Sequence, residues 1–75
     1  MHKEINLRGI PCPMNYVRCK LEIEQLNHNQ KLQVDLDRGE PEEMVLSGLK
    51  DQGYKIKIIL QESDWIRFLV ISNGR

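Results

Sequence analysis

The sequence predicts a two-layer α/β sandwich of the α+β kind, in which a four-stranded mixed sheet carries two helices on one face. Three observations predict it. The chain has 75 residues, which suits a single domain spanning 1–75. Its apolar residues alternate, then recur at a helical period, and later alternate again. The resulting order, β-α-β-α-β-β, contains two strand–helix–strand units and a closing hairpin.

The N-terminal third of the chain supplies the first strand and helix. Residues 4–7 alternate polar and apolar side chains, which is typical of a short strand. Residues 8–13 contain one Gly and two Pro and predict a turn. Helical spacing then runs from Met14 to Leu26. Its buried stripe consists of Tyr16, Cys19, Ile23 and Leu26, and a smaller apolar group on the opposite side consists of Met14, Val17 and Leu21.

The rest of the chain supplies three strands and one helix. Residues 32–37 alternate as a half-buried strand. A turn over 37–41 leads into a helix at Pro41, which buries Val45, Leu46 and Leu49 and ends near Gly53 as its left-handed cap. Residues 54–60 and 65–71 predict strands joined by a hairpin at 61–64. We expect parallel pairing among the first three strands and antiparallel pairing of the last.

Charge and hydropathy exclude several classes of function. Eleven Lys and Arg balance eleven Asp and Glu, whereas a non-specific binder of nucleic acid or anionic membrane needs a basic excess. No apolar run is long enough for a transmembrane helix, and the first residues lack the apolar stretch of a secretory leader. A cytoplasmic protein without direct nucleic-acid or membrane binding is therefore expected.

Cys12 is the residue that most suggests chemistry. Pro13 restricts Cys12 to extended backbone angles, which an N-cap residue also needs, and Pro13 itself suits the first helical position. Free N–H groups and the positive end of the helix dipole would then face the thiol and lower its pKa. Cysteine is not a preferred cap, so a reactive thiol is favoured over a structural role. Arg8 is close in sequence and is a candidate for added positive charge.

The second cysteine and the two histidines predict no further chemistry. Cys19 lies on the buried helical stripe and is expected to be a small core residue. Seven residues of helix separate it from Cys12 by about 10 Å, too far for a disulfide. His2 and His28 do not form a zinc-ligand spacing with either cysteine. No metal and no cofactor are expected.

Turns that leave the carboxyl ends of parallel strands meet at one edge of the sheet. The turn at Cys12, the turn at 37–41 and the hairpin at 61–64 should therefore be neighbours. Asp37 and Glu40 are interpreted as ordinary turn residues, and Arg38 as a cation able to stabilise a terminal sulfur anion. Neither turn holds a histidine to act as a general base, which favours a carrier that depends on partner enzymes.

The sheet face opposite the helices is the second candidate surface. Alternation places Ile66, Phe68 and Val70 toward the helices. The outward apolar residues are then Trp65, Leu69 and Ile71, joined by Ile59 from the neighbouring strand. This open face predicts a surface for a partner or for weak self-association.

The segment Leu7-Arg8-Gly9-Ile10-Pro11-Cys12-Pro13 resembles the signature of the TusA-like (SirA-like) sulfur-carrier family. Such proteins carry a Leu-Arg-Gly turn leading into a Cys-Pro-x-Pro motif, and they share this length and element order. The resemblance implies a single TusA-like domain and a sulfurtransferase-type carrier, with a persulfide on Cys12. It implies a cysteine desulfurase or a rhodanese as donor. The implied recipients belong to tRNA thiolation, molybdenum-cofactor assembly or sulfur oxidation.

The sequence departs from this motif at Asn15, which replaces the second proline; a second departure is Asn6, where an Asp is common. Proline offers no N–H, whereas the Asn15 backbone does, and an N-cap side chain accepts from that position. Asn15 is therefore predicted to give the Cys12 thiolate one extra donor and a lower pKa than Asn15→Pro would have.

Two other functions compete with the sulfur carrier. One is a non-catalytic interaction or regulatory module that uses the open sheet face, with Cys12 as a mere cap. The other is an RNA-binding domain, which small α/β sandwiches can form on an exposed sheet. Loss of function in Cys12→Ser distinguishes the sulfur carrier from the interaction module, because serine caps a helix at least as well as cysteine. The neutral charge counts against the second.

Overall fold

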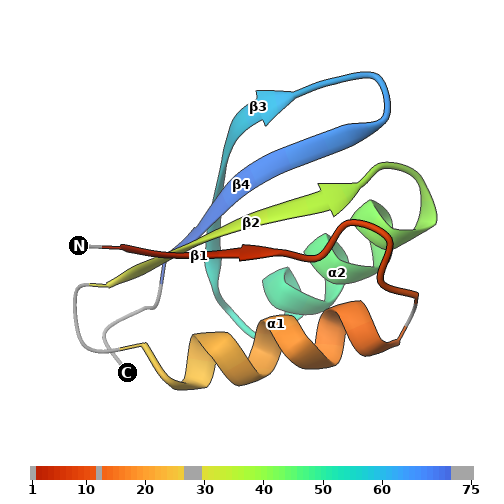
Figure 1. Ribbon diagram of the computed structural model, residues 1–75. Coiled ribbons are helices and arrows are strands. Elements are labelled where there is room, and N and C mark those ends of the chain that lie inside the picture. The colour runs from red at the N-terminus through yellow and green to blue at the C-terminus, as the bar shows by residue number, and fades with distance from the viewer. Residues whose placement is uncertain (1, 12, 27–29, 72–75) are drawn as a thin grey trace.

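The computed structural model describes residues 2–11, 13–26 and 30–71, and it has the predicted order of elements (Figure 1). The strands and helices are β1 (His2–Asn6), α1 (Met14–Glu24), β2 (Lys31–Asp37), α2 (Glu40–Asp51), β3 (Lys55–Gln61) and β4 (Trp65–Ile71). Both helices pack on the same face of the four-stranded sheet (Figure 1). The predicted two-layer sandwich is thereby confirmed.

The strand order is β1-β2-β4-β3, with β1 parallel to β2 and β4 antiparallel to both of its neighbours. The predicted parallel pairing is therefore confirmed for β1 and β2. It is wrong for β3, which runs in the same direction as β2 but pairs with β4 alone. The antiparallel direction predicted for β4 is confirmed. The burial of the two hairpin strands explains the order. Ile66, Phe68 and Val70 of β4 are completely buried, whereas most side chains of β3 are exposed. The strand with the more apolar face occupies the centre of the sheet, and β3 forms an edge.

The core lies between the helices and the inner face of the sheet. Two central strands contribute alternate residues, as period-two spacing requires. Its buried members are Leu7, Cys19, Ile23, Leu26, Leu32, Val34, Leu36, Val45, Leu49, Ile66, Phe68 and Val70. The predicted stripe of α1 is thus confirmed at Cys19 and Ile23, while Tyr16 is half-buried against the cluster. Leu26 is buried as predicted, but it lies beyond α1, which ends at Glu24 and not at Leu26.

The start of α1 differs from the prediction by one residue. Pro13, and not Cys12, occupies the N-cap position, and Met14 is the first helical residue. Pro13 has φ −93° and ψ 5°, in the bridge region rather than in extended backbone. Its carbonyl accepts from the Val17 N–H at 3.0 Å, so this proline already belongs to the first helical turn.

A bulge interrupts the alternation of β3. Ile58 lies opposite Phe68 and Leu60 lies opposite Arg67, which leaves Ile59 as the additional residue. The run of three consecutive apolar residues there hides this irregularity in the sequence. After the bulge, β3 continues to Gln61, one residue beyond the predicted end, and the hairpin closes with the Glu62 N–H donating to the Trp65 carbonyl at 2.8 Å.

Candidate functional site

The loop that follows β1 is held by the carboxylate of Asp37. One oxygen of Asp37 accepts from Arg8 Nε at 2.9 Å, and the other accepts from the Gly9 backbone N–H at 2.8 Å. Gly9 has φ +78°, a left-handed conformation that residues with a Cβ rarely adopt. These bonds connect the loop preceding Cys12 to the end of β2. They also lower the pKa of Asp37, first through the Gly9 N–H and then through Arg8.

Asp37 therefore does more than the ordinary turn role that its sequence position suggested. The sequence did contain a signal for this. Asp37 ends a strand whose polar residues share the open face, and the neighbouring strand ends just before Arg8. The two turns were predicted to lie at one edge of the sheet, and the Arg8–Asp37 pair confirms that placement. Which carboxylate bridges the two turns was not evident from the sequence.

Arg8 is engaged on the open side of the sheet. Besides Asp37, its guanidinium lies 3.5 Å from Asp64 Oδ2 and 5.5 Å from the centre of the Trp65 ring. The Arg8 backbone N–H donates to Asn6 Oδ1 at 2.9 Å. Arg8 thus joins β1, β2 and the hairpin, and its charge is balanced there by carboxylates.

Arg38, the other predicted cation, connects a different set of groups. Its Nε donates to Glu42 Oε1 at 3.2 Å, one turn along α2, and its Nη1 donates to the Glu62 carbonyl at 2.9 Å. The hairpin therefore meets the β2–α2 turn at the expected edge. Glu40 was predicted to be a turn residue preceding a helix that begins at Pro41; it is instead the first residue of α2, capped by Gly39, and its side chain is exposed.

Cys12 lies outside the described residues, so its predicted position and reactivity stay predictions. The residues on either side of it are described. Pro11 and Pro13 are both exposed, and Pro13 lies at the N-terminus of α1. The chain on both sides of Cys12 is therefore accessible at the helix end where the thiol was expected.

Asn15 differs from its predicted role. Its backbone N–H donates to the Pro11 carbonyl at 3.1 Å, so the extra donor predicted for the Cys12 thiolate is already used. Its side chain is completely buried, and Oδ1 accepts from the Tyr16 N–H at 2.6 Å. No acceptor for Nδ2 is present within the described part of the chain. The signal in the sequence was spacing, because Asn15 precedes Cys19 by four residues and so extends the buried stripe.

Cys19 is confirmed as a core residue. It is fully buried, and its thiol is free. Burial raises the pKa of this thiol to about 12, since the anion would lose its hydration. Cys19 is consequently neutral and inaccessible at physiological pH.

Within the described residues, no three His, Cys, Asp or Glu side chains come together as a metal site, and no helix is long and apolar enough to cross a membrane.

The open sheet face has the predicted composition on β4 but is less apolar than expected. Trp65, Leu69 and Ile71 alternate with the buried residues and are half-buried themselves. Arg67 lies between Trp65 and Leu69, donates to both oxygens of Asp35 at 2.7 and 3.1 Å, and covers the Trp65 ring at 5.2 Å. Ile59 is exposed, but at the bulge of β3. The use of the open sheet face by a partner or for self-association stays a prediction.

Comparisons with known proteins agree with this architecture. Residues 3–72 match the model of the family described as sulfurtransferase TusA. A crystal structure of a SirA-like protein from Desulfitobacterium hafniense is similar in fold, with a TM-score of 0.76. The two sequences are 18% identical, and the alignment covers 96% of this chain and 97% of the other. No curated protein matches the sequence. Because the family model spans nearly the whole chain, this protein belongs to the TusA family.

Proposed function

We propose that the protein is a sulfur carrier in which Cys12 accepts sulfane sulfur as a persulfide and passes it to a partner protein. The observation behind the assignment of the persulfide to Cys12 is the burial of Cys19. The sequence contains two cysteines, and Cys19 has no exposed surface and a pKa near 12. A thiol must be accessible and deprotonated to attack a persulfide. Within a TusA-family chain, Cys12 is then the thiol suited to the transfer.

The transfer needs no external oxidant. The Cys12 thiolate attacks the outer sulfur of a donor persulfide, R–S–S⁻ or its protonated form. A bond forms between Cys12 Sγ and that sulfur, the donor S–S bond breaks, and the donor leaves as its thiolate. In the second step, an acceptor thiolate attacks the outer sulfur of Cys12–S–S⁻ and Cys12 returns to thiolate. Each step is a thiol–disulfide type of exchange, so sulfur oxidation states balance.

The described residues around Cys12 support this proposal through access and rigidity. Pro11 and Pro13 are exposed, so a partner can approach the chain at this point. Asp37 fixes Arg8 and Gly9 on the N-terminal side of Pro11. The contribution of Arg8 and Arg38 is then structural, because carboxylates and a carbonyl already bind their guanidinium groups. Stabilisation of the sulfur anion falls to the N-terminal end of α1 and to the partner.

The experiment that tests the proposal is intact-mass measurement after incubation with a cysteine desulfurase and cysteine, without reductant. Wild type, Cys12→Ala and Cys19→Ala are compared. We expect a gain of one sulfur atom, removed by reductant, in wild type and Cys19→Ala and not in Cys12→Ala. A gain that persists in Cys12→Ala would refute the assignment. If wild type gains nothing, the same comparison with a rhodanese and thiosulfate tests the other donor class.

The alternative is an interaction module in which Cys12 has no chemical role. Cys12→Ser separates the two functions, because serine preserves a small polar residue at this position and cannot form a persulfide. A carrier loses sulfur transfer in this variant, whereas an interaction module keeps partner binding and activity. Trp65→Ser tests the open sheet face directly. If self-association and partner binding are unchanged in this variant, that face is not the contact surface.

A further inference from the structure

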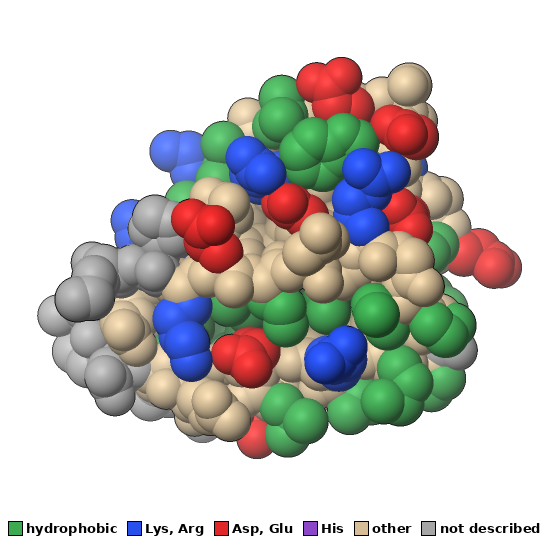
Figure 2. Space-filling view, viewed as in Figure 1, with side chains coloured by type: hydrophobic (Ala, Val, Ile, Leu, Met, Phe, Trp, Pro, Cys, Tyr) green, Lys and Arg blue, Asp and Glu red, His purple; other side chains and the backbone are tan. Residues whose placement is uncertain are grey.

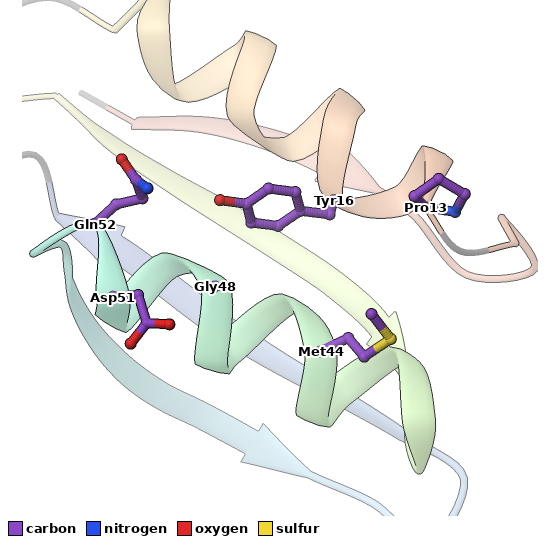
Figure 3. Close-up of a pocket in the computed structure, with 6 residues that line it drawn as sticks. All are labelled: Pro13, Tyr16, Met44, Gly48, Asp51 and Gln52. Atoms are coloured by element: carbon purple, nitrogen blue, oxygen red, sulfur yellow. The ribbon is translucent and has the colours of Figure 1, made fainter.

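A groove runs between the two helices on the side of the molecule away from the sheet. It has a volume of about 340 Å³ and is lined by Pro13, Tyr16, Met44, Gly48, Asp51 and Gln52. Figure 3 shows Tyr16 pointing from α1 across the space between the helices, with Pro13 and Met44 toward one end and Asp51 and Gln52 toward the other. We call this surface the α1/α2 groove.

The absence of a side chain at Gly48 lets the Tyr16 ring form the floor of the α1/α2 groove. A Cβ at this position would lie 2.6 Å from Tyr16 Cε1, closer than a Cβ and a non-bonded carbon approach in proteins. The Tyr16 ring therefore rests directly against the backbone of α2. This contact makes a smooth, largely apolar floor between the helices, in which a side chain from another molecule can lie.

Other exposed apolar side chains of α1 lie outside the lining of the α1/α2 groove. Met14, Val17 and Leu21 follow one another at helical spacing on the side opposite the core, and they are 51%, 40% and 54% exposed. Met44, which lines the groove on α2, is 54% exposed. Figure 2 shows hydrophobic side chains gathered over the N-terminal half of α1. Exposed apolar side chains gathered in this way are typical of a surface for protein interaction.

The rim of the α1/α2 groove on α2 is acidic. Glu40 lies one turn before Met44, and Asp51 lines the other end of the groove. Among the described residues, neither carboxylate forms an ion pair with a Lys or Arg. The nearby Lys20 lies 5.1 Å from the centre of the Tyr54 ring, at the C-terminal end of α2. Lys50 is next to Asp51 in the sequence, but it is two residues from Gly48 and therefore lies on a different face of α2 from the groove.

We propose that the α1/α2 groove binds a basic amphipathic helix of a partner protein. Apolar side chains of that helix lie between Tyr16 and Met44, and its Lys or Arg residues pair with Glu40 and Asp51. These two acids are eleven residues apart on α2, a rise of about 16 Å. The occupant therefore has basic residues about three turns apart with an apolar stripe between them. The proposal rests on the groove alone and does not require sulfur transfer by Cys12.

The test uses two synthetic helical peptides that differ only in charge. Both carry a Leu stripe, and one has Lys and the other Glu at two positions eleven residues apart. Fluorescence anisotropy measures their binding to wild type, to E40K/D51K and to E43K/E62K. The last is the matched control, because it also reverses two exposed acids, one of them in the first turn of α2. Thermal melts followed by circular dichroism establish that each variant folds.

We expect wild type to bind the Lys peptide, E40K/D51K to bind it about tenfold more weakly, and the control to match wild type. E40K/D51K should gain affinity for the Glu peptide. NMR shift mapping should place the bound peptide at Tyr16, Met44 and Gly48. The proposal is overturned if wild type binds neither peptide, if E40K/D51K behaves like the control, or if the shifts fall on the open sheet face.

Discussion

The contact between Gly48 and Tyr16 makes a quantitative prediction about α2. Alanine in place of glycine within a helix stabilises it by about 1 kcal/mol, because glycine loses more backbone entropy on folding. In this protein the new Cβ would lie 2.6, 3.1 and 3.3 Å from three atoms of the Tyr16 ring. The ring would have to move by about 0.8 Å to restore an ordinary contact of 3.4 Å. Such overpacking costs about 1–3 kcal/mol.

The two effects have opposite signs, and overpacking is the larger. Gly48→Ala should therefore lower the free energy of unfolding by about 1 kcal/mol in the wild-type background. In a Tyr16→Ala background the obstacle is gone, and the same substitution should raise it by about 1 kcal/mol. The coupling between the two positions is then about 2 kcal/mol, within the range for residues in direct contact. In a domain of this size, 1 kcal/mol corresponds to about 4–8 °C in Tm.

Urea denaturation of the four proteins in this cycle measures the coupling, with fluorescence of Trp65, the single tryptophan, as the signal. Ser47→Ala is the matched control. This position is exposed on the same helix, so its small gain in helix propensity should be equal in both backgrounds. If Gly48→Ala stabilises wild type and Tyr16→Ala by the same amount, the ring does not rest on Gly48 and the reasoning is refuted.

Two further predictions concern titrating groups. The Cys19 thiol has a pKa of about 12 in the folded state and an ordinary value near 9.0. Its contribution to stability is therefore complete below pH 9 and is lost as pH rises from 9 to about 12. In Cys19→Ala the free energy of unfolding in urea should decline less over that window, and an unchanged slope would contradict the assigned burial. The pKa of Asp37 is lowered in the folded state, so its contribution is present above its ordinary value of 3.8 and is lost as pH falls. Asp37→Asn should therefore weaken the dependence of stability on acid pH. It should also speed hydrogen exchange of the Gly9 amide about tenfold, since that N–H loses a charged acceptor. Normal protection of the Gly9 amide in this variant would show that Asp37 does not hold the loop.

Local patterns in the sequence determined the elements of this fold and the faces they bury. Alternation in β2 and β4 and helical spacing in α1 follow directly from backbone geometry, so they identified Val34, Phe68 and Cys19 as inward-facing residues. The signature segment from Leu7 to Pro13 indicated the family because all of its residues are contiguous in the chain. These inferences needed no knowledge of long-range contacts.

Tertiary structure decided what depends on residues far apart in the chain. The insertion of β4 between β2 and β3 follows from competition among strands for the buried centre, which no single segment reveals. The bond between Asp37 and the Arg8–Gly9 loop spans 28 and 29 residues, and it required the register of β1 against β2. The α1/α2 groove depends on one Tyr16 ring meeting one glycine of the other helix. Periodicity assigns a residue to a face, whereas packing of two faces selects the partner that it meets there.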